Sequence, residues 1–153
     1  MHVEDIMTRH CRTVQVDTPL REVVSTMTLY RISGLPVLDT DGTMKGFIAE
    51  KDVLHYLFPS LEDSMNSMIT VDFEGMEDSY ASVINLKVSD LMCTTVVSIS
   101  SDTPILKATS IMVRHRFRRI PVVDNGQLVG MLSLGDVHKA LFKKTIADAS
   151  ASL

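Results

Sequence analysis

The stretch RRIPVVDNGQLVGMLSLGD, residues 118–136, repeats an earlier phrase, SGLPVLDTDGTMKGFIAEKD, at residues 33–52. Sliding the sequence by 85 positions aligns residues 3–39 with residues 88–124 without a gap and gives twelve identities over 37 positions. Removing one turn residue extends the match at an offset of 84, and turns are where insertions are tolerated most easily. The chain therefore contains an internal repeat, and the repeat organises the fold.

Both copies predict the same order of elements. DTPL and DTPI predict a helix with Thr as N-cap and Pro at the first helical position. An apolar stripe at helical spacing follows, made of Leu20, Val23, Val24, Met27 and Tyr30 in one copy and of Ile105, Ala108 and Met112 in the other. A strand (LPVLD or IPVVD), a tight turn, a second strand (MKGFIA or LVGMLS) and a short helix (EKDVLHYLF or LGDVHKALF) come next.

A further strand, TVQV or VVSIS, precedes each long helix. Each copy is thus a β-α-β-β-α unit of the α+β class. A unit of roughly 50 residues is too small to bury a stable core alone, so we expect the two copies to pack together with pseudo-twofold symmetry. The predicted domains are repeat 1 (residues 1–58), a partly helical connector (59–87), repeat 2 (88–145) and a C-terminal tail (146–153).

The segment between the repeats is acidic. Residues 55–87 contain six carboxylates and one basic residue, Lys87. The apolar residues from Leu57 to Ile69 predict one helix, and YASVINLKVSDLM (80–92) predicts a second helical stretch. A solvated linker with two anchoring helices explains these charges better than a functional acidic patch does.

The bulk properties exclude several classes of function. The chain has 153 residues, 45% of them hydrophobic, a net charge of −4 and a pI near 5.7, which argues against nucleic acid as a partner. There is no membrane-spanning apolar run and no signal-peptide pattern at the N-terminus. Cys11 and Cys93 show neither CxxC nor metal-ligand spacing, so we expect a cytoplasmic chain with reduced thiols.

Catalytic signatures are missing from the sequence. We find no nucleophile–base pairing, no glycine-rich phosphate loop and no metal-ligand cluster, and the five histidines are scattered. We therefore expect a protein that is not an enzyme and has no catalytic or metal-binding residues. A redox role for Cys11 and Cys93 is the weaker alternative.

The ordered set of motifs, occurring twice, resembles a tandem pair of CBS domains, the Bateman module. The resemblance covers residues 3 to about 58 and 88 to about 142. It implies a regulatory module that binds an adenosine nucleotide such as AMP, ADP or ATP in clefts between the repeats. It also implies a homodimer, arranged as a four-repeat disc, that reports ligand binding to an unidentified regulated protein.

The family's ribose motif is a glycine, two apolar residues and then [Thr/Ser]-x-x-Asp. The second repeat matches it fully, from Gly130 to Ser133 and Asp136, whereas the first keeps Asp52 but has Ala49 in place of the hydroxyl. An Asp at a helix start can accept hydrogen bonds from both ribose hydroxyls, and such charge-assisted bonds are the stronger kind. The alternative is that these residues only cap the helix, although capping alone would not need both Ser133 and Asp136.

The resemblance places the base against the segment that leads into the first strand and against the next strand. The corresponding residues are Thr94, Thr95, Val97, Ile120 and Pro121 for one cleft, and Cys11 and Thr13 for the other. Ordinary core packing explains the apolar members equally well.

Positive charge for the phosphates is concentrated in VRHRFRRIP, residues 113–121. A helix C-terminus favours cations, which explains the first arginines of this stretch. Arg118 and Arg119 lie nearer the strand, where the resemblance places phosphate-binding side chains that face the Asp52 site across the cleft. Lys51, beside Asp52, is a further candidate. The alternative function is a ligand-free dimerisation or interaction module.

Overall fold

The order of helices and strands along the chain follows most of what the two sequence copies predict. The computed structural model describes residues 1–58 and 72–152. It divides into two units, each treated separately below. The first-repeat unit comprises Arg12–Asp41 and Lys45–Val96, and the second-repeat unit comprises Met1–Cys11, Gly42–Met44 and Val97–Leu153.

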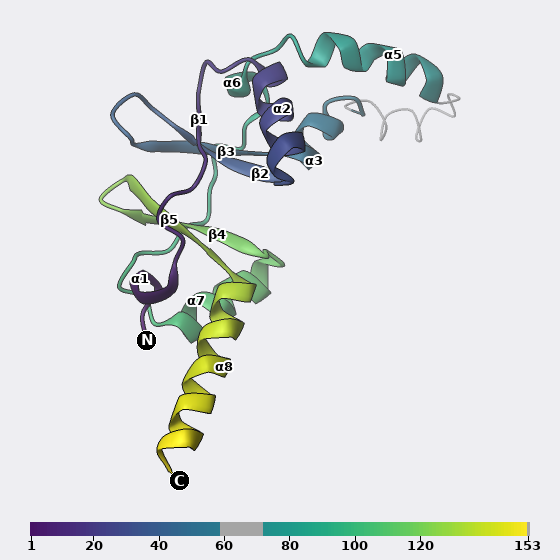
Figure 1. The fold of residues 1–153 in the computed structure, drawn as a ribbon. Helices are drawn as coiled ribbons and strands as arrows, with labels where there is room; N and C mark the ends of the chain where they lie inside the picture. Colours follow the sequence, from purple (N-terminus) through teal and green to yellow (C-terminus); the bar gives the residue numbers. More distant parts are fainter. Residues whose placement is uncertain (59–71, 153) are drawn as a thin grey trace. The chain divides into compact units, whose positions relative to one another are not determined.

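The first-repeat unit is a three-stranded sheet with helices (Figure 1). Its elements are β1 (Val14–Gln15), α2 (Leu20–Tyr30), β2 (Gly34–Leu38), β3 (Met44–Ala49), α3 (Glu50–His55), α5 (Phe73–Val83) and α6 (Val88–Leu91). The strand order is β1-β2-β3, and β1 runs parallel to β2 with Val14 opposite Val37.

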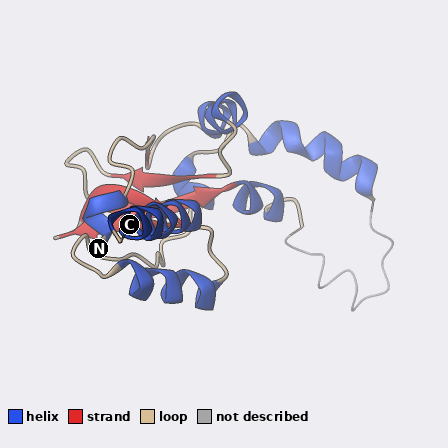
Figure 2. Ribbon diagram, turned by 60° about the horizontal axis from the view of Figure 1, so that its bottom comes forward, coloured by secondary structure: helices blue, strands red, loops and turns tan. Residues whose placement is uncertain are grey.

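The second-repeat unit repeats this plan around an antiparallel pair of strands. Its elements are α1 (Val3–Ile6), α7 (Ile105–His115), β4 (Arg119–Asp124), β5 (Gln127–Ser133) and the long α8 (Leu134–Ala151). The segment before α7 joins β4 only through a parallel bridge between Ile99 and Val122. Figure 2 distinguishes these strands from the helices. The α+β class is confirmed.

Both long helices begin one residue later than the sequence predicts. Pro19 and Pro104 are the N-cap residues, with extended backbone, and the helices start at Leu20 and Ile105. The hydroxyl of Thr18 accepts a hydrogen bond from the Gln15 amide, so it closes the preceding turn instead of capping the helix. Proline at the N-cap still starts a helix well because it has no N–H to leave unpaired.

Each unit has its own hydrophobic core, formed largely by the predicted apolar stripes. Leu20, Val23 and Met27 are buried in α2, but Tyr30 is 45% exposed and so lies outside the stripe predicted for it. The α7 stripe of Ile105, Ala108 and Met112 is fully buried.

The short helices α1 and α6 are exchanged between the repeats. Val3, from the first sequence copy, has no exposed surface in the core of the second-repeat unit, and Val88 is equally buried in the core of the first-repeat unit. The Val3 amide donates to the Thr103 carbonyl, as the Val88 amide does to Thr18. Each compact unit therefore combines residues from both sequence copies.

The chain segment that follows each exchanged helix packs closely against a glycine, Gly130 in one unit and Gly46 in the other. Thr8 pairs with Met131 next to Gly130, and Cys93 pairs with Phe47 next to Gly46. A Cβ at Gly130 would lie 2.8 Å from the Thr8 carbonyl oxygen, and one at Gly46 would lie 2.7 Å from that of Cys93. Gly130 of the sequence motif is therefore required by a close backbone approach.

Three further expectations differ from, or lie outside, the described structure. The strand predicted over residues 96–100 is reduced to a single bridge, and residues 146–151, predicted as a tail, continue α8. The helix predicted from Leu57 to Ile69 falls mostly on residues 59–71, outside the described part of the chain. No helix among the described residues is long and apolar enough to cross a membrane.

We predict that Gly46→Ala and Gly130→Ala each lower the free energy of unfolding by about 1–3 kcal/mol, because the new methyl group displaces a paired backbone segment. Gly135→Ala is the matched control. Its Cβ would lie 3.6 Å from the Ser133 hydroxyl, and alanine is favoured over glycine inside a helix by about 0.5–1 kcal/mol. Chemical denaturation measures all three, and equal stabilities would contradict the prediction.

Candidate functional site

The candidate site in the second-repeat unit is built where β5 passes into α8. The Ser133 hydroxyl accepts a hydrogen bond from the Asp136 amide at 3.0 Å, and Asp136 Oδ2 accepts one from the Ser133 amide at 3.0 Å. This reciprocal capping box satisfies two donors at the helix start. Capping thus uses both residues, contrary to the expectation that it would not need them both.

The first-repeat unit has the same junction between β3 and α3, with one half of the cap missing. Asp52 Oδ2 accepts a hydrogen bond from the Ala49 amide at 2.8 Å, while Ala49 has no hydroxyl to return one. Within the described part of the chain, Oδ1 of Asp52 and Oδ1 of Asp136 accept no hydrogen bond. Both carboxylates are half-buried and keep one oxygen available to a ligand.

The same cap also occurs away from the candidate site. Asp5 Oδ2 accepts from the His2 amide at 2.8 Å, and Asp90 Oδ2 accepts from the Lys87 amide at 2.9 Å. These two aspartates start α1 and α6. A capping aspartate in this chain is therefore no mark of a ligand site by itself.

The two predicted arginines lie at the same end of the sheet as the Ser133–Asp136 cap. Arg119 is directly opposite Ser133 in the β4–β5 ladder, and the Arg118 carbonyl accepts from the Leu134 amide at 3.0 Å. Both arginine side chains are exposed. Within this unit, basic and hydrogen-bonding groups therefore lie on neighbouring chain segments.

The equivalent end of the first-repeat unit carries no such charge on β2. The Ser33 carbonyl accepts a hydrogen bond from the Glu50 amide at 2.9 Å. This bond is equivalent to the one between the Arg118 carbonyl and the Leu134 amide in the other unit. At Gly34 a Cβ would lie 2.5 Å from the ring of Phe47, so that ring occupies the side-chain position filled by Arg119 in the other unit. Lys51 is exposed beside Asp52.

The residues predicted to contact the base are divided between the units. Thr94, Thr95 and the exposed Thr13 belong to the first-repeat unit, whereas Val97 packs against the core of the second. The second-repeat unit also holds three further candidates, Cys11, Ile120 and Pro121. Ile120 has no exposed surface, so core packing is the role seen for it.

Both thiols are free. Cys11 is half-buried, and burial raises the pKa of its thiol, which disfavours the reactive thiolate at neutral pH. Cys93 is exposed, and its Sγ donates to the Thr95 carbonyl at 3.3 Å. Among the described residues, no group of three or more His, Cys, Asp or Glu side chains is placed to hold a metal ion.

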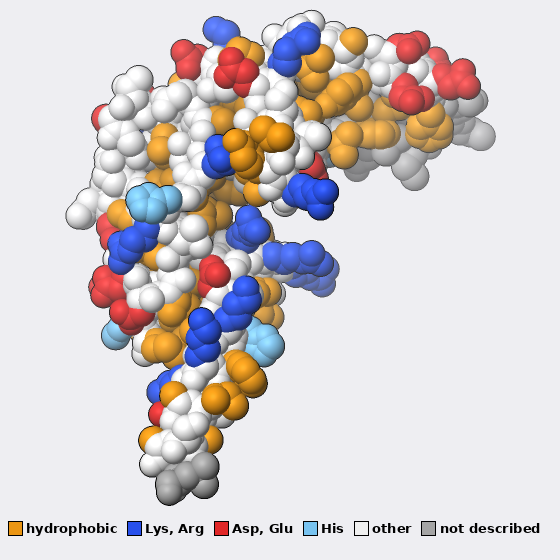
Figure 3. Space-filling view, in the orientation of Figure 1, with side chains coloured by type: hydrophobic (Ala, Val, Ile, Leu, Met, Phe, Trp, Pro, Cys, Tyr) orange, Lys and Arg blue, Asp and Glu red, His pale blue; other side chains and the backbone are white. Residues whose placement is uncertain are grey.

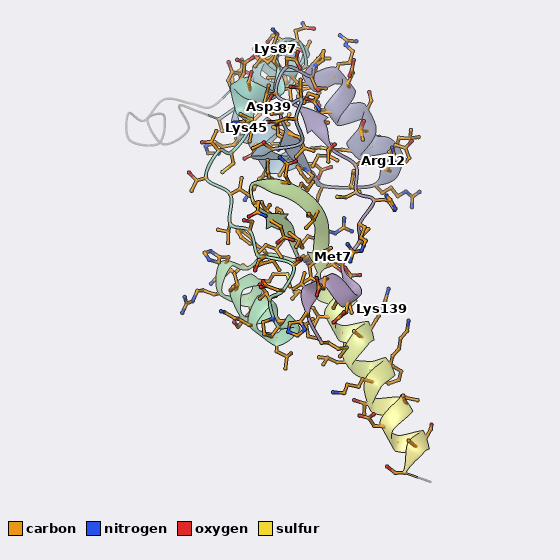
Figure 4. All side chains as sticks on the ribbon, turned by 90° about the vertical axis from the view of Figure 1, so that its left-hand side faces the viewer. Met7, Arg12, Asp39, Lys45, Lys87 and Lys139 are labelled. Carbon is orange, nitrogen blue, oxygen red and sulfur yellow. The ribbon has the colours of Figure 1, made fainter. Side chains whose placement is uncertain are left out.

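Two side-chain contacts were not anticipated from the sequence. The Arg12 guanidinium lies 3.2 Å from the centre of the Tyr30 ring, as in a cation–π contact. Figure 4 labels Arg12. Ser101 donates from its hydroxyl to Asp124 Oδ2 at 2.6 Å and from its amide to Oδ1 at 3.0 Å. No pattern in the sequence predicts the contact between Arg12 and Tyr30. The contact of Asp124 has one signal in the sequence, because an aspartate occupies the same position, Asp39, in the first copy.

The Ser101 hydrogen bonds, the side-chain one foremost, lower the pKa of Asp124 below its ordinary value. We predict that Ser101→Ala raises this pKa, as carbon-detected NMR titration of the carboxyl group would measure. The pKa of Asp124 is lower in the folded protein than in the unfolded chain. Its hydrogen bonds with Ser101 therefore stabilise the fold at pH values above the unfolded-state pKa, and this stabilisation is lost as the pH falls through the folded-state pKa. Ser100→Ala is the control, since Ser100 bonds Asp102 instead; an unchanged Asp124 pKa in Ser101→Ala would refute the assignment.

A family model described as "CBS domain" matches residues 3–59 and residues 88–143. A relative of Methanocaldococcus jannaschii, "Uncharacterized protein MJ1426", is 32% identical over 92% of this chain and 91% of its own length. The "CBS domain-containing protein YhcV" of Bacillus subtilis is 27% identical over 88% of this chain and 81% of its own.

Among solved structures, CBSX2 of Arabidopsis thaliana is similar over nearly its full length. The crystal structure of CBSX2 in complex with AMP has a TM-score of 0.72 and 26% sequence identity, covering 94% of this chain and 98% of that one. A further crystal structure of CBSX2 gives a TM-score of 0.75.

Proposed function

This chain belongs to the CBS-domain family, and we propose that it is a regulatory module that binds an adenosine nucleotide of the AMP, ADP or ATP type. In this proposal the chain has no catalytic activity of its own. It couples the bound nucleotide to its own conformation or to that of a regulated partner. CBSX2, solved with AMP, is the relative that supports the choice of ligand.

The observation that carries the proposal is the equivalent placement of Asp52 and Asp136. In each unit one carboxylate oxygen caps a helix and the other accepts no hydrogen bond within the described part of the chain. A half-buried carboxylate with an acceptor to spare suits the paired hydroxyls of ribose, and charged acceptors bind them more strongly than neutral ones.

Arg118 and Arg119 are the proposed phosphate-binding residues, because both are exposed cations. The family resemblance assigns them to the nucleotide at Asp52, although Arg119 is also opposite Ser133 in its own sheet. Arginine presents several N–H donors in a planar fork that matches phosphate oxygens. Lys51 offers the corresponding charge in the first-repeat unit, where β2 itself begins with glycine. The base would lie against Thr94, Thr95, Val97 and Pro121, or against Cys11 and Thr13.

Regulation would follow from differential affinity. A ligand that binds one conformation better than another shifts the population toward it by as much as that difference in binding free energy. The homodimer and the regulated partner in this proposal are taken from the family resemblance. The cytoplasmic location is taken from the cysteine pattern of the sequence.

We predict that isothermal titration calorimetry detects AMP, ADP or ATP binding, and that Asp136→Asn weakens it about tenfold or more. The amide oxygen of asparagine still accepts from the Ser133 amide, so the cap survives, while the charged acceptor for ribose is lost. Asp90→Asn is the matched control, because Asp90 makes the same cap at α6. Equal losses in both variants would remove Asp136 from the site.

A second prediction separates phosphate binding from nucleoside binding. The double variant Arg118→Ala/Arg119→Ala should weaken ATP about tenfold or more and leave adenosine nearly unaffected, since charge-assisted hydrogen bonds contribute roughly 1.5–3 kcal/mol each. Equilibrium dialysis with labelled ATP and adenosine measures both. Unchanged ATP affinity would assign the phosphates elsewhere.

A ligand-free interaction module is the second candidate, favoured by the use of Asp5 and Asp90 in identical caps away from the site. It predicts that no adenosine nucleotide raises the melting temperature even at millimolar concentration. A binder must gain stability by mass action, about 2.7 kcal/mol at a hundredfold excess over Kd.

A further inference from the structure

The ring of Tyr30 supports an arginine and takes no part in the core. Tyr30 is the last residue of α2 and is 45% exposed. The central carbon of the Arg12 guanidinium lies 3.2 Å from the centre of this ring, and Arg12 is exposed as well. Because exposed cation–π contacts are weak, this one fixes the position of the arginine more than it stabilises the fold.

The N–H groups of Arg12 are available to a ligand. Within the described part of the chain, the Arg12 side chain donates no hydrogen bond and joins no ion pair, and the ion pair found there links Lys45 to Asp39. The tyrosine ring faces the central carbon of the guanidinium, so the N–H groups around that carbon can bond an anion. Arg12 is therefore a cation that is held in place and still has its donors free.

Arg12 lies at the same end of the first-repeat sheet as Asp52. Strand β1 begins at Val14 and runs parallel to β2, so the chain before Val14 lies toward the start of β2. The Ser33 carbonyl, just before β2, accepts a hydrogen bond from the Glu50 amide at the start of α3. The start of β2 therefore adjoins the start of α3, where Asp52 forms its cap.

The opposite end of this unit holds three of its other cations. Arg21 is in the first turn of α2, and Lys87 forms a backbone bridge with Pro19, the residue before that helix. Lys45 lies near the start of β3 and pairs with Asp39. Acidic side chains gather over α5 in Figure 3, so the unit as a whole does not attract anions. A negatively charged ligand therefore depends on the few cations near the α3 cap.

The two units place arginine on different elements near this junction. The second-repeat unit has Arg119 at the start of β4, where the first-repeat unit has Gly34 at the start of β2. Conversely, the alignment of the two copies places Val97 opposite Arg12. The first-repeat unit thus has its arginine on the segment before β1, in place of one on the strand.

We propose that Arg12, positioned by Tyr30, binds the phosphate groups of a nucleotide whose ribose is held by Asp52. This inference rests on the proposed nucleotide-binding function and adds a phosphate-binding residue from within the first-repeat unit. Cys11 and Thr13, the base candidates of this site, flank Arg12 in the sequence. A guanidinium fork matches phosphate oxygens, and holding it on the ring beforehand reduces the entropy lost on binding. Tyr30 is a positioning residue that acts through Arg12.

Equilibrium dialysis of the full chain with labelled ATP and labelled adenosine provides the test. The Asp136→Asn background leaves Asp52 as the intact ribose site. In that background Arg12→Gln should weaken ATP about tenfold and leave adenosine nearly unchanged, because charge-assisted hydrogen bonds to phosphate are lost. In the Asp52→Asn background it should change ATP affinity by less than about twofold. Arg21→Gln is the matched control, since it removes an exposed charge at the other end of α2.

Variants of Tyr30 test its positioning role in the Asp136→Asn background. Tyr30→Phe keeps a ring and should leave ATP affinity unchanged, whereas Tyr30→Leu should weaken ATP about threefold. The combination of Arg12→Gln with Tyr30→Leu should bind ATP no more weakly than Arg12→Gln alone, because the ring acts through the arginine. A merely structural role of Tyr30 would instead weaken ATP and adenosine alike and would add to the effect of Arg12→Gln.

Unchanged ATP affinity in Arg12→Gln, with ATP bound by the parent chain, would overturn this inference and leave the proposed function standing. An equal loss for adenosine would overturn it as well, and so would the absence of ATP binding in Asp136→Asn. A wild type that binds neither ATP nor adenosine would overturn the proposed function together with this inference.

Discussion

The fold depends on two close backbone approaches, those of Thr8 to Gly130 and of Cys93 to Gly46. Each lets a segment of one sequence copy pair with the last strand of the other, which brings a short helix and its buried valine into the core. A side chain at either glycine would separate these strands. Since neither core is complete without the exchanged helix, the two sequence copies are expected to fold cooperatively and not one after the other.

The two units share a backbone frame but not its side chains. The same amide-to-carbonyl bond joins Leu134 to Arg118 in one unit and Glu50 to Ser33 in the other. At equivalent positions beside this bond, one unit has Arg119, and the other has Gly34, which lies against the Phe47 ring. The two sequence copies thus share the backbone hydrogen bond at this junction, while the side chains beside it differ.

The helix α8 begins at the proposed ligand site. Its first turn holds the Ser133–Asp136 cap, and the residues from Phe142 to Ala151 are exposed. A ligand bound to Asp136 would stabilise the start of this helix. Because a helix forms cooperatively, ordering its first turn favours the turns that follow.

The sequence by itself determined the repeat, the α+β class, the apolar stripes of α2 and α7 and the placement of Asp52 and Asp136 at helix starts. These follow from periodicity and capping, which are local properties of the chain. Only the tertiary structure decided that α1 and α6 pack into the core of the opposite repeat and that the backbone of Thr8 packs against Gly130. It also decided that Ser101 donates a hydrogen bond to Asp124. Such contacts join residues far apart in the chain, and local patterns carry no record of which distant segments will meet.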